Sequence, residues 1–136
     1  MSRLIYLDTN IYRDFLEMRT NRKGRPLDEL SGKVFDRAVS CEFNIVISDW
    51  VIEQLSHQSM LEKSRVLFSE LKERKKFIHV LTDNEDRIAA RKSGNYDDYL
   101  HALLARKGNA EYLITRNIKD FIPFKKLIEP KLPENL

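Results

Sequence analysis

Acidic side chains follow several of the apolar segments of this chain, and their positions suggest what chemistry it can perform. Asp8 comes directly after the apolar run 4–7 and is followed by Thr9 and Asn10. An apolar run bounded by turn-forming residues is typical of a buried strand. In an open parallel sheet, ligands and reactions lie just beyond the carboxyl ends of the strands. Asp8 therefore stands where a functional acid is expected.

Three further acids are predicted near the same edge. Glu53 lies one helical turn beyond Ser48, Asp98 opens the helix before the fourth strand, and Asp120 follows that strand. Two carboxylates about 4 Å apart repel each other by about 4 kcal/mol at an effective dielectric of about 20. A fold that gathers such groups needs a cation or protons to neutralise them. For each acid taken alone, a helix cap or a solvated surface charge is the alternative explanation.

A divalent cation is the chemistry that this set of acids favours. Mg²⁺ and Mn²⁺ prefer hard oxygen ligands, and Mg²⁺ is often bound through a few carboxylates together with water and substrate phosphates. Such an ion can activate water and neutralise the charge of a phosphate group during hydrolysis. The sequence therefore predicts metal-dependent chemistry on a phosphate ester.

The elements that must position these acids alternate between strands and helices. Strands are predicted at 4–7, 43–47, 77–81 and 112–115, with a possible fifth within 124–128. Helices are predicted at 11–18, 30–39, from 49 onward, and at 60–75, 83–92 and 96–106. Asn10 or Thr9 is expected to cap the first helix, and Thr82 with Glu85 forms a capping box for the fifth. The fourth helix is expected to bury Leu61, Val66, Phe68 and Leu71.

This alternation predicts a single α/β domain over residues 1–136. The expected architecture has three layers, α/β/α, around a central and mostly parallel sheet of four or five strands. The length suits one domain with a real core, and 42% hydrophobic and 33% charged residues are ordinary for a globular protein.

Charge, cysteine content and the lack of a long apolar run limit the partners, the disulfides and metal clusters, and the location expected for the protein. The net charge is +3 and the pI is about 9.0, which permits an anionic partner without requiring one. The single cysteine, Cys41, excludes a disulfide within the chain and a cysteine-based metal cluster. No apolar run approaches the roughly 20 residues of a membrane span, and the N-terminus does not have the pattern of a signal peptide. We expect a cytoplasmic protein without a membrane partner.

Four segments together resemble one family. They are Leu7-Asp8-Thr9-Asn10, then Ser48 followed five residues later by Glu53, then the stretch from Asp98 to Ala105, and finally the stretch from Leu113 to Phe121. In this order and at this chain length they resemble the PIN-domain ribonucleases. The resemblance covers essentially the whole chain and is greatest to the small VapC-type toxins of bacterial and archaeal toxin–antitoxin pairs.

The resemblance implies a metal-dependent endoribonuclease with a PIN-like fold and Mg²⁺ or Mn²⁺ as cofactor. Asp8 and Asp98 would be the principal metal ligands, and Glu53 would take the second acidic position. Asn10 would brace Asp8, and Thr115 would hydrogen-bond within the acidic cluster. These roles are expectations carried over from the family.

The fourth position of the acidic cluster stays open between two residues. Family members often have an acid two residues after the threonine, where this chain has Asn117. An amide oxygen can bind a metal but supplies no charge, so Asp120 is the alternative. Two histidines are also near these acids by helical spacing. His57 is four residues after Glu53, and His101 either orients Asp98 or is an ordinary buried histidine.

The resemblance also implies partners. These are an RNA substrate, an antitoxin protein that covers the site, and a second copy of the chain in a homodimer. Arg116 is expected either to contact phosphate or to pair with an acid. Weaker RNA-binding candidates are Arg13, Arg22, Lys23 and Arg25, with Tyr12 and Tyr96 as possible stacking rings.

Two other functions remain as alternatives. Asn117 in place of an acid is consistent with a PIN-like scaffold that binds RNA or protein with a weakened site. A phosphatase of the haloacid-dehalogenase kind also has an acid after its first strand. Such enzymes have an Asp-x-Asp pattern, and here Asn10 stands at the third position and removes their general acid.

Overall fold

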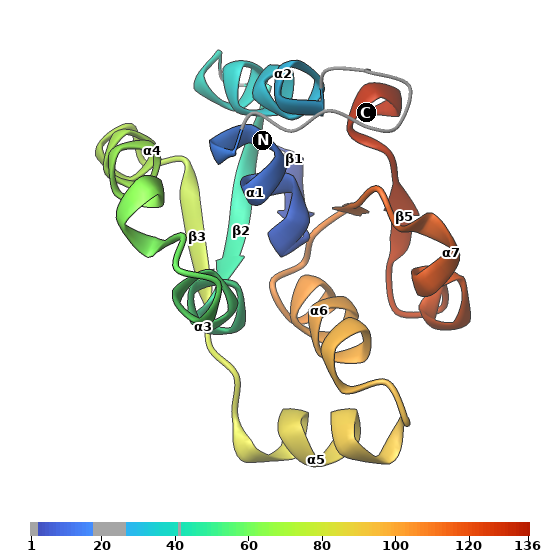
Figure 1. Ribbon diagram of the computed structural model, residues 1–136. Coiled ribbons are helices and arrows are strands. Elements are labelled where there is room, and N and C mark those ends of the chain that lie inside the picture. Colours follow the sequence, from blue (N-terminus) through green and yellow to red (C-terminus); the bar gives the residue numbers. More distant parts are fainter. Residues whose placement is uncertain (1–2, 18–26, 41) are drawn as a thin grey trace.

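The computed structural model describes residues 3–17, 27–40 and 42–136, without the side chains of 27–31 and 39. Figure 1 shows strands and helices alternating along the chain. The strands are β1 (Arg3–Leu7), β2 (Phe43–Ser48), β3 (Phe77–Val80), β4 (Tyr112–Ile114) and β5 (Glu129–Lys131). The helices are α1 (Thr9–Leu16), α2 (Leu27–Val39), α3 (Asp49–His57), α4 (Leu61–Glu73), α5 (Asn84–Lys92), α6 (Tyr96–Lys107) and α7 (Ile118–Phe121), with 3₁₀ turns η1 (Ile122–Phe124) and η2 (Pro133–Asn135).

The five strands form one parallel sheet in the order β3-β2-β1-β4-β5. The chain builds outward from β1 to β2 and β3 on one side, and then returns to place β4 and β5 on the other. The strand order therefore reverses between β1 and β4. In open α/β sheets, the crevice for a ligand opens at such a reversal, beyond the carboxyl ends of the strands.

Helices cover the sheet in two groups, which gives the three-layer α/β/α fold expected from the sequence. Helix α1 contacts α2, α3 and α4, whereas α6 contacts α5, α7 and β4. One close approach fixes the end of α6 on the sheet. A Cβ atom added to Gly108, just after α6, would lie 2.4 Å from Cγ1 of Val46 in β2. Any larger residue at position 108 would push this end of the helix away from the sheet.

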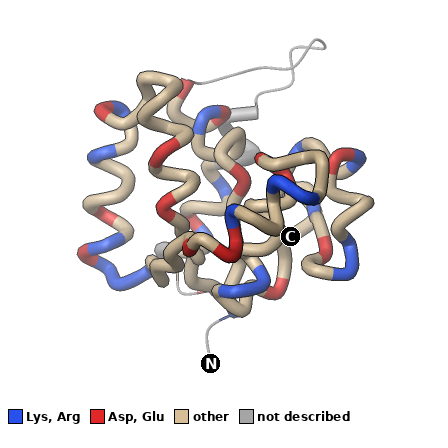
Figure 2. The backbone as a smooth tube through the Cα atoms, turned by 90° about the horizontal axis from the view of Figure 1, so that it is seen from below, with Lys and Arg blue, Asp and Glu red and all other residues tan. Residues whose placement is uncertain are grey.

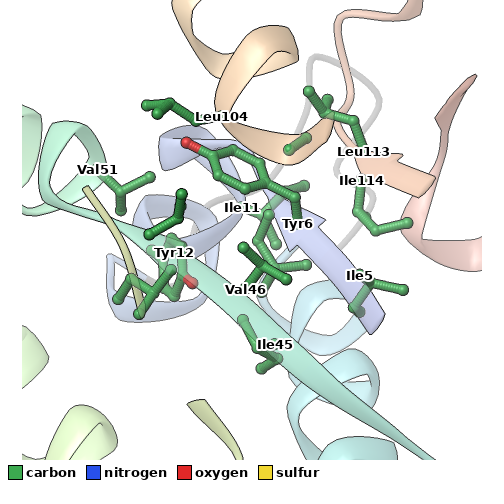
Figure 3. Packing of buried hydrophobic residues seen from close by; sticks show 14 of the residues in the cluster. Ile5, Tyr6, Ile11, Tyr12, Ile45, Val46, Val51, Leu104, Leu113 and Ile114 are labelled. Atoms are coloured by element: carbon green, nitrogen blue, oxygen red, sulfur yellow. The ribbon is translucent and has the colours of Figure 1, made fainter. Parts of the chain in front are cut away.

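The core is built from the strands and the helix faces that pack on them. Figure 3 shows side chains of β1, β2, β4, α1, α3 and α6 meeting in one cluster. Central strands of a parallel sheet are covered on both faces and therefore read as continuous apolar runs. Accordingly, Ile5, Tyr6 and Leu7 are all fully buried. The predicted strand ends therefore lie on a rigid support.

Several local expectations were wrong. The first helix begins at Thr9, so its N-cap is Asp8 rather than Asn10 or Thr9. The capping box of α5 is formed by Asp83 and Asp86, because the amide and hydroxyl of Thr82 donate to the Asp49 carboxylate at 3.0 and 2.6 Å.

The C-terminal strand and one helix face also differ from expectation. The fifth strand is Glu129–Lys131, after the segment 124–128 expected to be extended, and the first residue of that segment, Phe124, ends a 3₁₀ turn that Pro123 favours. Pro130 is tolerated in β5 because this strand lies at the sheet edge. Val66 is 78% exposed, whereas Leu71 is buried and Phe68 partly buried. The inner face of α4 is therefore rotated away from Val66.

Neither charge nor hydropathy singles out a surface by itself. Figure 2 shows Lys and Arg residues interspersed with Asp and Glu along the helices in that view. None of the helices in the described ranges is long and apolar enough to cross a membrane. The site is therefore best sought from the geometry at the sheet edge.

Candidate active site

Asp8 lies at the point where the strand order reverses. It follows β1, its backbone N–H donates to the Ile114 carbonyl of β4 at 3.0 Å, and its carboxylate accepts from the Thr115 hydroxyl at 3.0 Å. The residue is only 6% exposed. Asp8 thus follows β1 and is held by the end of β4, and the hydrogen bond from Thr115 agrees with the role expected for that residue.

Burial sets the electrostatics of Asp8. It raises the pKa of the carboxyl above its ordinary value, and the negative charge of Asp120 acts in the same direction. The Thr115 hydroxyl and the nearby backbone N–H groups of Asn10 and Thr9 oppose this rise in pKa. The charged form is therefore held in a place that does not favour it in the absence of a cation.

A polar pocket of about 210 Å³ opens beside Asp8. Its wall is almost entirely polar, and it is made by the ends of β1 and β4 and by α1, α3 and α6. The lining residues are Asp8, Thr9, Asn10, Gln54, Gln58, Asp97, Asp98, His101 and Asn117. The predicted residues Asp8, Asn10, Asp98 and Asn117 therefore meet at one place, although they are far apart in the sequence.

Asp98 is the second carboxylate close to Asp8. Partial burial raises the pKa of its carboxyl, the Asn95 side chain lowers it by hydrogen bonding at 3.0 Å, and the charges of Asp8 and Asp120 raise it again. The neighbouring Asp97 also lines the pocket but is exposed. The first turn of α6 thus presents two carboxylates, and Asp98 is the one whose pKa is raised by Asp8.

The two candidates for the fourth position of the acidic cluster, Asn117 and Asp120, lie differently relative to the pocket. Asn117 lines the pocket and donates its backbone N–H to the Thr115 hydroxyl at 3.0 Å. Asp120 is exposed and does not line the pocket, but its charge raises the pKa of both Asp8 and Asp98. Asn117 is therefore placed for contact, and Asp120 adds negative charge from one turn away.

Glu53 does not join this group, which differs from the sequence expectation. Its carboxylate lies 3.6 Å from Arg87 and 3.9 Å from His57, and it does not line the pocket. Gln54 lines the pocket instead. Successive helical residues point about 100° apart, so a shift of one position along α3 exchanges one side chain for the other.

Helical periodicity could have found Gln54. Val51 and Leu55 are the buried residues of α3. Counting about 100° per residue places Gln54 about 60° from Val51, and Glu53 about 160° from it. The apolar neighbours of Glu53 in the sequence therefore do not surround it in the helix.

His101 is the second site residue whose role the sequence left unsettled. It is 2% exposed, and burial lowers the pKa of its imidazole to about 4. Its Nδ1 lies 2.8 Å from the Tyr6 hydroxyl, and its Nε2 lies 2.7 Å from Oε1 of Gln54 and 3.8 Å from Asp8. His101 is therefore a neutral ring between β1 and α3 at the back of the pocket. Within the described residues its hydrogen-bond partners are Tyr6, Thr9 and Gln54 rather than Asp98.

Arg116 and Arg13, the two described residues among those proposed for RNA binding, do not line the pocket. The Arg116 guanidinium donates to Asp14 at 3.2 Å and to Glu134 at 3.1 Å, and Arg13 pairs with Glu17 at 3.3 Å. Of the two alternatives for Arg116, the structure thus shows the pairing with acids. Arg22, Lys23 and Arg25 lie outside the described residues.

The two tyrosines proposed as stacking rings are also committed elsewhere. Tyr12 is fully buried against Phe35 and Phe68. Tyr96 is partly buried, accepts a hydrogen bond from Arg87 at 3.0 Å and packs edge-on against Trp50. Neither ring lines the pocket.

The donor set can be tested for its fit to a divalent cation. In the described chain, no three His, Cys, Asp or Glu side chains converge closely enough to hold a metal by themselves. The same part of the chain forms no ion pair between Lys or Arg and Asp8, Asp98 or Asp120. Mg²⁺ commonly uses one or two carboxylates and completes its shell with water and phosphate. Asp8 and Asp98, with the Asn117 amide oxygen nearby, fit that mode of binding.

Comparison with known proteins adds no family assignment. No protein-family model matches the chain, and no curated protein matches it either. The motifs and the geometry of the pocket are therefore the features that indicate a function.

Proposed function

We propose that this chain is a Mg²⁺- or Mn²⁺-dependent endoribonuclease that hydrolyses RNA phosphodiester bonds. One observation carries the proposal: the buried Asp8 carboxylate lies near Asp98 in a polar pocket at the reversal of the strand order, with no Lys or Arg paired to either acid in the described chain. Burying such charges is costly unless a cation accompanies them. The sequence resemblance to PIN-domain ribonucleases supplies the reaction class.

The proposed roles follow from the contacts. Asp8 and Asp98 would hold the cation, which supplies charge neutralisation and activation of water when it is bound. Thr115 fixes one oxygen of Asp8 by its hydrogen bond, and Thr115 is in turn held by the Asn117 backbone. Asn117 would offer a neutral oxygen at the rim. The residues of the chain thus contribute orientation and negative charge, and they need no histidine as a base.

Cleavage of RNA by the purified protein tests this function. With Mg²⁺ or Mn²⁺ we expect cleavage that EDTA abolishes, and Asp8→Asn and Asp98→Asn should each lower the rate by about 100-fold or more. Glu53→Gln should lower the rate by less than about tenfold, since its carboxylate faces Arg87 and His57 rather than the pocket. Asp36→Asn, an exposed carboxylate of α2, is the matched control. Metal-independent cleavage, or full activity of both pocket variants, would contradict the proposal.

A non-catalytic scaffold is the second candidate, and two observations favour it. The pocket contains the amides of Gln54 and Asn117 where acids were expected, and no group of three acids meets within the described residues. Such a protein would bind RNA but would not cleave it, whichever divalent cation is present. RNA binding by wild type, together with complete absence of cleavage in Mg²⁺ and Mn²⁺, would select the scaffold.

The setting of this activity is also part of the proposal. By resemblance, the chain would be the toxin of a toxin–antitoxin pair, would act in the cytoplasm, and would form a homodimer that an antitoxin silences. Light scattering of the purified protein reads the oligomeric state directly. Expression of a toxin should arrest growth, and co-expression of the product of an adjacent small reading frame should relieve the arrest. Asp8→Asn is the control, because growth arrest that persists in this variant would show that the toxicity is not enzymatic.

A further inference from the structure

Gln54 is held by a buried chain of polar side chains behind the pocket. Its Oε1 lies 2.5 Å from the Thr9 hydroxyl and 2.7 Å from Nε2 of His101. The other nitrogen of His101 lies 2.8 Å from the Tyr6 hydroxyl, which lies 2.7 Å from the Ser48 hydroxyl. Five elements, β1, β2, α1, α3 and α6, therefore meet through these contacts.

With Oε1 of Gln54 facing Thr9 and His101, the direction of each hydrogen bond follows. A carbonyl oxygen can only accept, so Thr9 donates to Oε1 of Gln54 and His101 donates to it from Nε2–H. Nδ1 of the neutral imidazole must then accept from the Tyr6 hydroxyl. The Tyr6 oxygen accepts from Ser48, whose own oxygen accepts from the Val51 backbone at 3.2 Å. Every member of the chain is satisfied in this arrangement.

This direction determines what Gln54 offers to the pocket. Its carbonyl oxygen already accepts two hydrogen bonds, and these occupy both of its lone pairs. Its Nε2 amide group has no partner among the described residues, although Gln54 lines the pocket. The free end of the side chain is therefore a neutral hydrogen-bond donor beside Asp8 and Asp98. A metal ion requires a lone pair and cannot be bound by this group.

We infer that Gln54 is a substrate-contacting residue, whose Nε2 amide donates a hydrogen bond to a phosphate oxygen of the bound RNA. This inference rests on the proposed function. Among the described residues, the pocket wall has two carboxylates near Asp8 and no Lys or Arg, so an incoming phosphate meets repulsion from these charges. A fixed neutral donor lowers that repulsion without competing with the cation for the carboxylates. Thr9 and His101 position Gln54, because the hydrogen bonds that they donate to Oε1 hold its carboxamide in this orientation.

The tautomer of His101 tests the orientation directly. Two-dimensional ¹⁵N–¹H spectra of the imidazole rings in the metal-free protein should show His101 neutral, with the proton on Nε2 and none on Nδ1. A proton on Nδ1 would mean that the Gln54 amide is turned, so that its NH₂ donates to His101 and its oxygen faces the pocket. That result would overturn the inference, and it needs neither RNA nor activity.

Binding of RNA tests the contact itself. The probe is a fluorescent 2′-O-methyl oligonucleotide titrated in saturating Mn²⁺ and read by anisotropy, and gel electrophoresis after each titration checks that the probe is still intact. Gln54→Glu keeps an acceptor for Thr9 and His101 but replaces the donor by a second acceptor with a charge. We expect its RNA affinity to fall by about tenfold or more, since a donor to an anion is among the stronger hydrogen bonds. Gln58→Glu, the same change at an exposed pocket residue, should lower affinity by less than about threefold.

The outcomes separate this inference from the function on which it rests. Suppose that the wild type cleaves RNA and that Gln54→Glu binds RNA as tightly as the wild type or more tightly. This result overturns the role of Gln54 but does not contradict the nuclease function. Equal losses in Gln54→Glu and Gln58→Glu also overturn it, because general charge repulsion then explains both. No RNA binding by wild type, with the Nε2–H tautomer observed, contradicts the nuclease and the RNA contact together while the orientation of the amide holds.

Discussion

Asp8 is a carboxylate held where its charge is poorly solvated. It is 6% exposed, and burial raises the pKa of its carboxyl. The nearest histidine is neutral because burial lowers the pKa of His101 to about 4, so it supplies no compensating positive charge at neutral pH. Asp8 is thus ready to be neutralised by a cation, and its ionised form weakens the fold until that happens.

Replacing Asp8 by Asn should therefore separate stability from function. In EDTA at pH 7, we expect Asp8→Asn to have a higher free energy of unfolding than wild type, since Asn keeps an acceptor for Thr115 and removes the buried charge. Mg²⁺ at about 100 times its Kd should stabilise the wild type by about 2.7 kcal/mol and leave the variant unchanged. Urea unfolding with and without Mg²⁺ measures both quantities. A variant less stable than wild type in EDTA would contradict this account of Asp8.

Single residues show where sequence reasoning succeeds and where it stops. The resemblance to the PIN-domain ribonucleases implied that Thr115 hydrogen-bonds within the acidic cluster, and Thr115 does donate to Asp8. The two residues meet because β1 and β4 are paired parallel strands that end at one edge. Gln54 was missed because an expected acid stood next to it, and nothing in the residue types decides between neighbours on a helix. Only the phase set by Val51 and Leu55 distinguishes them.

Three elements meet through His101, which makes it the most informative titratable group of the fold. It lies on α6 and joins Tyr6 of β1 to Gln54 of α3. Its imidazole has a folded pKa of about 4 against an ordinary value of 6.5. Between these two pH values, the unfolded chain binds a proton on His101 that the folded protein does not.

Stability should accordingly fall as the pH is lowered from 6.5 toward 4. For His101 alone the loss is about 3 kcal/mol at most. Asp8 acts in the opposite sense, since its raised pKa means that the folded protein holds a proton there which the unfolded chain has released above pH 3.8. A His101→Gln variant isolates the histidine. Urea unfolding at several pH values should show the stability advantage of wild type over this variant shrinking as the pH falls; a constant difference would contradict the assignment.

The elements themselves were largely predictable, and their ends were not. Apolar runs and helical stripes placed four strands and six helices near their observed positions, because burial dictates those patterns. Caps and edges depend on contacts between distant segments. Thr82 was expected to cap a helix but donates to Asp49, which lies 33 positions earlier. The fifth strand was expected within 124–128 and lies instead at 129–131, after a 3₁₀ turn that Pro123 favours.

At the scale of the whole molecule, Arg116 ties three distant segments together. Its guanidinium joins the end of β4 to Asp14 of α1 and to Glu134 near the C-terminus, at 3.2 and 3.1 Å. Asp14 is 3% exposed. Arg37 of α2 adds a hydrogen bond to the carbonyl of Leu136 at 2.8 Å. The C-terminal segment is thus part of the fold and packs beside the first two helices.

Loss of Arg116 should destabilise the fold more than it weakens RNA binding. We expect Arg116→Ala to lower the free energy of unfolding by about 3 kcal/mol, because it removes a partner of a buried carboxylate. The free energy of unfolding of Arg116→Lys should lie between those of the wild type and Arg116→Ala, since a lysine keeps the charge but lacks the planar guanidinium group. RNA affinity of the folded variants should change less than about threefold. A stable Arg116→Ala protein that binds RNA weakly, with a salt dependence reduced by about one phosphate contact, would show that Arg116 binds phosphate after all.

The pairing of β1 with β4 has a consequence for how this protein is made. Asp8 is synthesised before the Thr115 that holds it, which comes 107 positions later in the chain. Chains emerge from the ribosome N-terminus first, and contacts between distant segments form only after both are available. An incomplete nascent chain thus has no pocket, because the second central strand is missing. For a protein proposed to cut RNA, this order of assembly keeps the chain harmless to its own message until β4 and Thr115 have been made.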